Sequence, residues 1–462
     1  MIMAPQWLQS LFLAVLLAGQ GMVNGLTLDV DDEASIKDIA GKAAYNTMSY
    51  YHSNESDSDL VPGKLPGTWW EGGALFMTLM QYWHWTGDDS YNDVTQQGML
   101  WQKGNDDYFP DNQSNYLGND DQVFWGLAAI TAAELNFPER KGDSSWVSLA
   151  QGVFNTQVPR WDTTACGGGL RWQIWPYQGG YMIKNAVSNG GLFQLAARLA
   201  RYTGNQTYFD WAEKIWDWSA TTPLLKQSDW TIADTTNMQA NCTDHGDLQW
   251  TYNYGQYLGG AAYMYNITNG DQKWKEGIDG LLGTTFRTFF PKKYGGQTMS
   301  EISCEPNMKC DRNQDCFKGF LSSWLTGMAE LVPYTYDEIM PKILESAKGA
   351  AQQCSGGDDG TQCGRRWYQD TWDGSTSMES DMSALSVISS TMFVHKRNQQ
   401  GPFTADTGGK SESDPTAGTA DENEQPGKLP DISTGDRAGA GIVTVVFVAM
   451  WGVAMTWMVY GG

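Results

Sequence analysis

Two adjacent aspartates, Asp120 and Asp121, stand directly before an apolar run in the stretch "NYLGNDDQVFWGLAAI", residues 115–130. The apolar positions after the pair recur with helical spacing, so the pair is predicted to begin a buried helix. Asn119 is predicted to cap this helix, with Gln122 closing a capping box. Acids in a first helical turn are also stabilised by the helix dipole, which gives the pair a purely structural explanation.

The same pair could perform chemistry. In a poorly solvated site, two neighbouring carboxyl groups favour opposite protonation states, one ionised and one protonated. Two such groups about 5 Å apart are what cleavage of a glycosidic bond with retention requires. Other Asp-Asp pairs, at residues 31–32, 88–89, 106–107 and 358–359, occupy polar, turn-like surroundings and are expected to be solvated. Asp120 and Asp121 are therefore the candidate catalytic residues.

Other chemistries have weaker support in the sequence. The four histidines form no HExxH or Cys/His motif. A calcium-loop-like start at Asp311 has Cys316 at the glycine position and Ser322 where a glutamate is needed. We therefore predict no metal and no cofactor. The formal net charge of −23 argues against nucleic acid as a partner.

A helical pattern recurs along the chain and indicates the elements that would position the pair. Apolar helical stretches starting at Phe76, Leu192 and Gly259 each run into a Gly-containing turn and then a second helical stretch. Long loops separate these helical hairpins, which favours a closed double ring over an open solenoid. The predicted fold is all-α, an α/α toroid.

Both ends of the chain resemble processing signals. A short apolar segment near the start predicts a secretory signal peptide, and an uncharged terminal segment behind small residues predicts a GPI-attachment signal. Ser433 or Gly435 is the expected attachment residue. The predicted organisation is a signal peptide at 1–25, a globular domain at 26–397, a disordered Gly/Pro/Ser/Thr/acidic stalk at 398–434 and a GPI propeptide at 435–462.

Features of a secreted protein support this organisation. Five sequons predict N-glycosylation on surface loops, at Asn54, Asn112, Asn205, Asn241 and Asn266. The seven cysteines suit an oxidising compartment, and Cys354 and Cys363 could close a local loop. Pairing among the others stays open: Cys304, Cys310 and Cys316 could pair among themselves or with Cys166 and Cys242.

Three motifs in order carry a resemblance to a known family. "PGTWWEGGALF" (residues 66–76), "NDDQVFWGLAA" (119–129) and "GDLQWTYNYGQYLGGAAYMY" (246–265) resemble glycoside hydrolase family 76, especially its fungal GPI-anchored branch. The resemblance covers nearly the whole globular domain. It implies an (α/α)6 barrel that hydrolyses α-1,6-mannosidic bonds in an endo fashion with retention. It also implies that Asp120 is the nucleophile and Asp121 the general acid/base.

Further candidates come from residue type. Trp69 and Trp70 are expected to stack on sugar rings, because indole faces pack against the apolar faces of sugars. Gln122 and Trp125 lie within about one helical turn of the pair and are expected to support it at the substrate. Side chains expected to hydrogen-bond sugar hydroxyls are Glu71, Asp247, Tyr252, Asn253 and Gln256. The Gly- and aromatic-rich segment 167–191 is expected to line the site.

The resemblance also implies partners. The expected donor is α-mannan or a GPI glycan, with a β-glucan as a possible acceptor in cell-wall assembly by transglycosylation. The protein is expected to be a monomer on the extracellular face of the plasma membrane or in the cell wall. Two alternatives stay open: a catalytically silent carbohydrate-binding scaffold, and an inverting α/α-barrel glycosidase that uses a distant second carboxylate such as Asp247.

Overall fold

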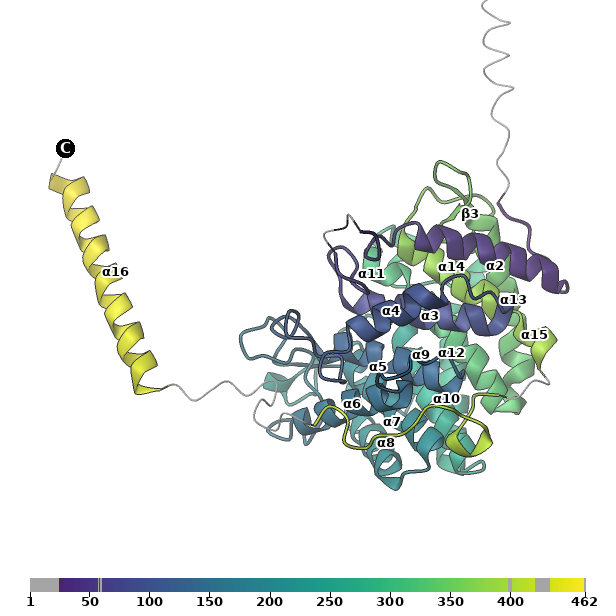
Figure 1. Ribbon diagram of the computed structural model, residues 1–462, viewed down its shortest axis with the longest axis horizontal. Helices are drawn as coiled ribbons and strands as arrows, with labels where there is room; N and C mark the ends of the chain where they lie inside the picture. The colour runs from purple at the N-terminus through teal and green to yellow at the C-terminus, as the bar shows by residue number, and fades with distance from the viewer. Residues whose placement is uncertain (1–24, 57, 59, 398–400, 420–432, 461–462) are drawn as a thin grey trace, which may run out of the picture.

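The computed structural model describes residues 25–56, 58, 60–397, 401–419 and 433–460. The predicted signal peptide, apart from residue 25, lies outside this range. Within the described chain, six helices form a closed inner ring in which each helix packs on the next and the last packs on the first (Figure 1). These helices are α3 (Trp70–Thr86), α5 (Asn119–Glu134), α7 (Ala186–Thr203), α9 (Thr251–Ile267), α12 (Phe317–Leu331) and α14 (Met378–Ser390).

An outer layer of helices packs against this ring, alternating with the inner helices along the chain. Its members are α2 (Glu33–Met48), α4 (Asn92–Trp101), α6 (Trp146–Gln157), α8 (Gln206–Ser219), α10 (Gln272–Phe289) and α13 (Tyr336–Gln353). Because each outer helix returns the chain to the same end, all six inner helices begin at one end of the barrel. The prediction of an all-α (α/α)6 toroid is confirmed.

The inner and outer helices differ in how much of their surface is buried. Every residue of α14 is buried, and so is every residue of α5 from Gln122 onward, whereas α8 and α10 bury one side only. Glycines let the inner helices approach closely. A Cβ on Gly191 of α7 would lie 2.5 Å from Val123 of α5, and one on Gly73 of α3 would lie 3.0 Å from Trp125. This close packing brings the first turns of the inner helices together.

The remaining elements are short. Two-stranded antiparallel sheets pair β1 with β2 and β3 with β4. Their bounds, with those of the small helices α11 and α15, are β1 (Ile183–Asn185), β2 (Thr235–Asn237), β3 (Cys354–Gly356), β4 (Gln362–Cys363), α11 (Arg312–Asp315) and α15 (Phe393–Lys396). The β1–β2 pairing matters most for the site, because it ties the loop before α9 to the start of α7.

Three disulfides settle the pairing that the sequence left open. Cys354 bonds to Cys363, as expected, and the other bonds are Cys166–Cys242 and Cys304–Cys310. Cys316 is a buried free thiol.

The predicted disordered stalk requires a correction. Residues 401–419 lie against the barrel and cross α6 and α7 as the yellow-green segment of Figure 1. The backbone N–H of Phe403 donates to the Glu134 carbonyl, and Ser411 Oγ donates to Glu139. Asp414 N donates to Gln151 Oε1 at 2.7 Å. Composition suggested disorder because this segment is poor in large apolar residues, but its polar groups find partners on the barrel. Residues 398–400 and 420–432 lie outside the described chain.

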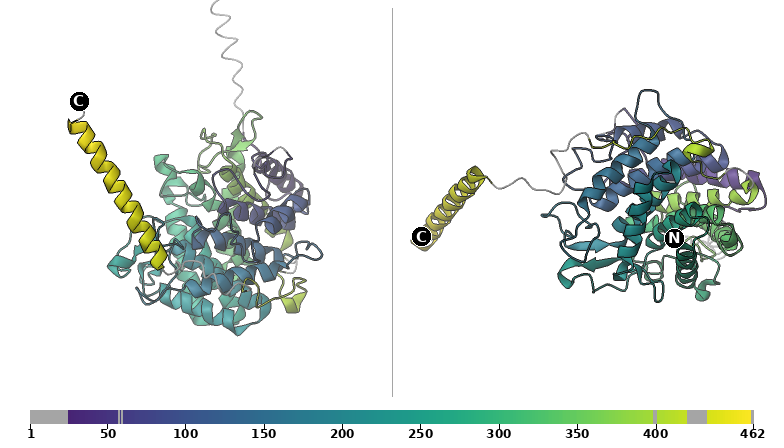
Figure 2. Two further views of the ribbon diagram at one scale, coloured as in Figure 1. Left: turned by 60° about the vertical axis from the view of Figure 1, so that its left-hand side comes forward. Right: turned by 90° about the horizontal axis from the view of Figure 1, so that it is seen from below.

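The C-terminal helix α16 (Thr434–Tyr460) stands apart from the barrel in Figure 1 and in the right-hand view of Figure 2. It is long and apolar enough to span a membrane, and all of its residues are exposed. Such a helix is compatible with a GPI-attachment signal.

The sequons differ in exposure. Asn54, Asn112 and Asn241 are exposed, whereas Asn205 and Asn266 are partly buried. The Asn266 amide donates to the Leu331 carbonyl at 3.3 Å, so this side chain already has a structural partner. Glycosylation stays a prediction at all five positions.

Candidate active site

Helix α5 begins with the aspartate pair. Its N-cap is Gly118, in an extended conformation, and the Asp121 carboxylate accepts the Gly118 backbone N–H at 2.7 Å. Asp121 is therefore the residue that caps the helix. This corrects the predicted cap formed by Asn119 and Gln122, whose side chains have other partners.

Glycine at position 118 lets the two carboxyl groups converge. A Cβ at this position would lie 2.2 Å from Asp120 Oδ1 and 3.3 Å from Asp121 Oδ2. Both oxygens thus lie near one point, and they are at most about 5.5 Å apart, because their separation cannot exceed the sum of those two distances. No side chain fits at position 118 without displacing a carboxyl group.

The environment of the pair favours keeping a proton. Burial and the charge of Asp121 raise the pKa of Asp120 well above its usual value, and the Trp172 side chain opposes this rise only partly. Burial raises the pKa of Asp121 to about 6, opposed by the Gly118 N–H. Asp120 Oδ1 is buried and has no hydrogen-bond partner among the described residues. At neutral pH the pair therefore shares one proton, and in the free protein the negative charge favours Asp121.

A buried polar network behind the pair fixes the first turn of α5. Gln122 donates to the Asp107 carbonyl at 2.8 Å and to Thr156 Oγ1 at 2.9 Å. Arg160 donates to Gln122 Oε1 at 2.7 Å and to Asn119 Oδ1 at 2.9 Å. Gln122 is fully buried, and its hydrogen bonds support a role in positioning the first turn of α5, while substrate contact stays a prediction.

A neighbouring segment holds the start of α5 from another side. Asn119 N donates to the Trp172 carbonyl, and Asn119 Nδ2 donates to the Arg171 carbonyl, each at 2.9 Å. Gly118 and Gln173 form an antiparallel bridge. The predicted cleft-lining segment 167–191 thus contacts the pair directly through residues 171–173.

Helix α9 brings a tyrosine to the site, and the residue before β2, Asp234, adds a third carboxyl group. Tyr252 stacks on Phe317 at 3.9 Å between ring centroids, and after burial the charges of Asp234 and Asp120 raise the pKa of its hydroxyl. Asn253 is buried and donates to Asp234 Oδ1 at 3.0 Å. Tyr252 therefore lies near the pair, and Asn253 contacts Asp234; for both residues a bond to sugar hydroxyls stays a prediction.

The tryptophans near the pair differ in exposure. Trp69 and Trp125 are buried and pack on each other at 5.1 Å, and Trp69 Nε1 donates to Gln102. Stacking of Trp69 on a sugar ring and support of the pair by Trp125 at the substrate stay predictions. Trp70 is partly exposed, packs on Phe124 of α5 at 4.7 Å and stays a candidate platform.

Glu71 does not reach the site as a free hydrogen-bonding group. It is fully buried, lies 3.5 Å from Arg312 and is close to Glu379, to which Arg312 also pairs. Burial and the Glu379 charge raise the pKa of Glu71 to about 9, so Glu71 is neutral at pH 7. In the free protein Glu71 thus contacts Arg312 and Glu379, and its role in bonding sugar hydroxyls stays a prediction.

The last two predicted residues, Gln256 and Asp247, differ in exposure. Gln256 is fully buried one turn further along α9, beside Gly190 and Gly191, and its amide has no hydrogen-bond partner among the described residues. Asp247 is exposed on the loop before α9. The structure brings Asp234, and not Asp247, toward the pair through Tyr252.

Comparison with known proteins agrees with this geometry. The family model for glycosyl hydrolase family 76 matches residues 35–406, which is nearly the whole barrel. The chain belongs to glycosyl hydrolase family 76.

Relatives within and beyond the fungi share this fold. The chain is 41% identical to the mannan endo-1,6-alpha-mannosidase DCW1 of Saccharomyces cerevisiae, over 95% of this chain and 96% of that protein. The crystal structure of Dfg5 from Chaetomium thermophilum in complex with glucosamine matches with a TM-score of 0.80 and 40% identity, covering 85% of this chain and 98% of that one. An inactive alpha-1,6-mannanase variant from Salegentibacter sp., with two consecutive aspartates changed to asparagine and in complex with alpha-1,6-mannotriose, matches with a TM-score of 0.60 and 17% identity, over 78% and 99%.

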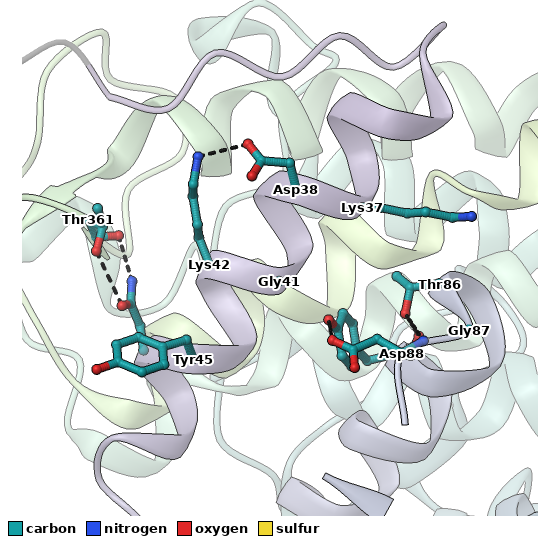
Figure 3. A pocket seen from close by; sticks show the side chains of 11 residues that line it. Lys37, Asp38, Gly41, Lys42, Tyr45, Thr86, Gly87, Asp88 and Thr361 are labelled. Carbon is teal, nitrogen blue, oxygen red and sulfur yellow. Dashed lines mark hydrogen bonds and ion pairs between the residues drawn. The ribbon is translucent and has the colours of Figure 1, made fainter. Parts of the chain in front are cut away.

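The family 76 barrel also has a hollow away from the pair. It has a volume of about 660 Å³ and lies between α2 and α3 on the outside of the ring (Figure 3). Its polar groups are paired: Lys42 with Asp38 at 2.7 Å, and the Asn46 amide with the Thr361 carbonyl at 2.8 Å. This hollow does not contain the catalytic candidates.

Sequence reasoning missed several residues of the site. Asp107 was expected to be solvated but is buried, and burial raises its pKa to about 6. Gly118, Arg160, Trp172 and Asp234 occur in no motif that indicates their role. Only Gly118 had a local signal, its position next to a capped acidic turn.

Proposed function

We propose that this family 76 glycoside hydrolase is a retaining endo-α-1,6-mannosidase that acts at the cell surface and passes its mannosyl group to water or to a sugar hydroxyl. One observation carries the mechanism. The facing oxygens of Asp120 and Asp121 are at most about 5.5 Å apart. Retention uses carboxyl groups about 5 to 5.5 Å apart, whereas inversion needs about 6.5 to 9.5 Å to admit a water molecule.

The relatives support the substrate. The curated relatives named above are mannan endo-1,6-alpha-mannosidases, and they match over almost their whole length. In the Salegentibacter enzyme, the inactive variant changes two consecutive aspartates and carries alpha-1,6-mannotriose. An adjacent aspartate pair is the feature that this chain shares with that description.

The proposed reaction has two steps. A carboxylate oxygen of Asp120 attacks the anomeric carbon, the bond from that carbon to the leaving oxygen breaks, and Asp121 gives its proton to the leaving oxygen. In the second step Asp121 takes a proton from water or an acceptor hydroxyl, whose oxygen displaces Asp120 from the anomeric carbon. The buried, unpartnered Asp120 Oδ1 supports the nucleophile assignment, because no protein hydrogen bond must break before attack.

This assignment requires the shared proton to move. In the free protein the Gly118 N–H favours charge on Asp121, whereas attack requires charge on Asp120. The positive charge that develops on the sugar ring next to Asp120 would draw the negative charge to that residue. Substrate binding would thereby leave the proton on Asp121, where the leaving oxygen needs it.

A binding scaffold without catalysis is a weaker explanation. Two partly buried carboxyl groups with raised pKa values destabilise the folded state, and a protein that only binds sugar gains nothing from them. An amide in either position would bind hydroxyl groups without this cost.

The proposed location follows from the chain ends. The apolar helix α16 behind Ser433 and Gly435 supports GPI attachment at one of these residues, and the predicted signal peptide supports export. The proposed donor is cell-wall mannan or a GPI glycan, and a β-glucan is the proposed alternative acceptor to water. Release from intact cells by a GPI-specific phospholipase tests the anchor, and retention of the protein after that treatment would exclude it.

The mechanism is tested by product analysis and by trapping. On an α-1,6-mannan oligosaccharide, proton NMR during early turnover should show the α-anomer first, and a β-anomer first would overturn retention. A 2-deoxy-2-fluoro mannosyl donor should label Asp120, as found by peptide mapping, with Asp120→Asn as the unlabelled control. A label on Asp121 would reverse the two roles.

A further inference from the structure

An exposed group of aromatic side chains lies beside the catalytic pair. Tyr116 is 79% exposed and Tyr177 is 59% exposed, and the nearby Trp175 is partly buried. The rings of Trp175 and Tyr177 are parallel within 8°, with centroids 6.1 Å apart. We call Tyr116, Trp175 and Tyr177 the aromatic patch.

Hydrogen bonds hold the aromatic patch in place. Trp175 Nε1 donates to the Ser114 carbonyl at 2.7 Å, and the Tyr177 hydroxyl donates to the Asn115 carbonyl at 3.2 Å. Gln178 Oε1 accepts the Trp175 backbone N–H at 2.8 Å. The loop before α5 and the loop before β1 therefore form one structure, and exposed rings that are fixed in this way lose little freedom when a ligand stacks on them.

The aromatic patch is also tied to the catalytic residues. Tyr116 is four residues before Asp120, so their Cα atoms are no more than about 15 Å apart. Trp172 and Gln173, on the same loop as Trp175, contact the first turn of α5 through the Asn119 N–H and the Gly118 bridge. A glycan chain bound at the pair therefore needs few further units to reach the aromatic patch.

The chemistry of the two loops points to a neutral ligand. Residues 112–119 and 172–182 contain no Asp, Glu, Lys or Arg, although the whole chain has a net charge of −23. The side chains there are aromatic rings, amides, a serine hydroxyl and the apolar Leu117, Ile174, Pro176 and Met182. Gln173 Oε1 is buried and has no hydrogen-bond partner within the described chain. Rings and amides without charge suit the apolar faces and hydroxyl groups of hexoses.

We infer that the aromatic patch binds a neutral hexose polymer beyond the bond that reacts, with sugar rings stacked on Tyr116 and Tyr177. This inference rests on the proposed function, because it extends the same active site. The bound polymer is either the rest of the α-1,6-mannan donor or a β-glucan acceptor, since both present the same kind of ring face.

Binding measurements on an inactive protein test the inference without requiring turnover. The Asp120→Asn protein, with its N-glycans trimmed, is titrated calorimetrically with α-1,6-mannan and β-1,3-glucan oligosaccharides of increasing length. Tyr116→Ala and Tyr177→Ala should each weaken binding of the longest oligomer of one polymer by roughly three- to tenfold, with a smaller effect on shorter ones. The polymer affected identifies the donor or the acceptor.

Tyr45→Ala is the matched control, because Tyr45 is 65% exposed on α2 and lines the hollow between α2 and α3, away from the pair (Figure 3). It should change binding by less than about twofold. Unchanged affinity for both polymers in the Tyr116 and Tyr177 variants would overturn the inference, as would an equal loss in the Tyr45 variant. If the wild-type protein fails to cleave or transfer mannan but the patch variants weaken binding, the proposed function fails and the inference stands.

Discussion

Helix α5 has acidic side chains at both ends, partly buried at its start and buried at its end, and their surroundings handle the charge in opposite ways. At the start, Asp120 and Asp121 face each other, and burial raises both pKa values. At the end, Glu134 pairs with Arg198 at 2.6 Å and accepts the Tyr263 hydroxyl at 2.8 Å. At the end of the helix, Arg198 compensates the charge of Glu134. At the start, the aspartate pair keeps one proton and so carries one negative charge instead of two.

This difference means that the acid at the end of α5 matters for stability, whereas the acids at its start are suited to exchange protons. A buried acid that is fully paired has no proton to exchange, and removing its partner leaves a charge without compensation. A buried acid beside another acid destabilises the fold, but it can give up or take a proton near neutral pH. The barrel therefore places its candidate catalytic carboxyl groups where α5 begins, and it has a full ion pair where α5 ends.

The largest expected effect comes from the reactive end. Asp120→Asn and Asp121→Asn should each lower kcat/KM on α-1,6-mannan by about a thousandfold or more, because each removes a group that forms or breaks a bond. Each variant should unfold at the same temperature as the wild type or higher, because the amide needs no proton and an amide oxygen at position 121 can still accept the Gly118 N–H. Steady-state kinetics and thermal unfolding check this prediction, and two fully active variants would remove the pair from the mechanism.

The other end should show the reverse pattern. Glu134→Gln should lower the free energy of unfolding by roughly 3–5 kcal/mol, because it leaves Arg198 charged and buried without a carboxylate. Its kcat/KM, measured well below the unfolding temperature, should change far less than that of the aspartate variants.

An exposed ion pair gives the control for Glu134. Asp38 pairs with Lys42 at 2.7 Å, but both side chains are largely exposed. Asp38→Asn should cost less than about 1 kcal/mol in denaturant unfolding. An equally small loss in Glu134→Gln would show that the two ends of α5 do not differ in the way described.

A substitution at Gly118 tests the position of the two carboxyl groups without changing their charge. Gly118→Ala keeps both aspartates but places a Cβ 2.2 Å from Asp120 Oδ1, so at least one carboxyl group must move. We expect kcat/KM to fall about 10- to 100-fold, since small displacements of reacting groups have effects of this size. Gly246→Ala is the control, because a Cβ there meets nothing within 4 Å. Equal kinetics in the two variants would contradict the convergence of the carboxyl groups at position 118.

The features that sequence predicts well in this protein are local in the chain. The helical hairpins show in apolar spacing and Gly turns, and Gly87 and Gly204 indeed end α3 and α7 in the left-handed conformation. The aspartate pair stands out because it directly precedes an apolar helix. Each of these signals lies within about 20 residues, so chain composition and spacing suffice to find it.

The features that sequence missed depend on contacts between distant segments. Asp234 reaches the site because β2 pairs with β1, and nothing near it in the chain indicates this. Trp69 was predicted as a platform and Trp125 as a support for the pair, and the packing of α3 on α5 brings these two rings into contact. Residues 401–419 looked disordered because their partners, such as Gln151 and Glu139, lie more than 200 residues away.

The smallest effect is a pH dependence in which activity and stability move in opposite directions. Burial raises the pKa of Asp121 to about 6, so a second proton binds the pair below that pH and removes the carboxylate that the reaction needs. We expect kcat/KM to fall about tenfold per pH unit below roughly pH 6.

Stability should follow the opposite course over the same window. Because the pKa of Asp121 is higher in the folded state than the usual value of about 3.9, its protonated form favours folding. That contribution is complete below about pH 4 and is lost as the pH rises through about 6. The advantage of Asp121→Asn over the wild type in unfolding temperature should therefore grow between pH 4 and 6 and stay constant above. An acid limb of activity near pH 4, together with a constant difference in unfolding temperature, would show that Asp121 titrates as an ordinary solvated aspartate.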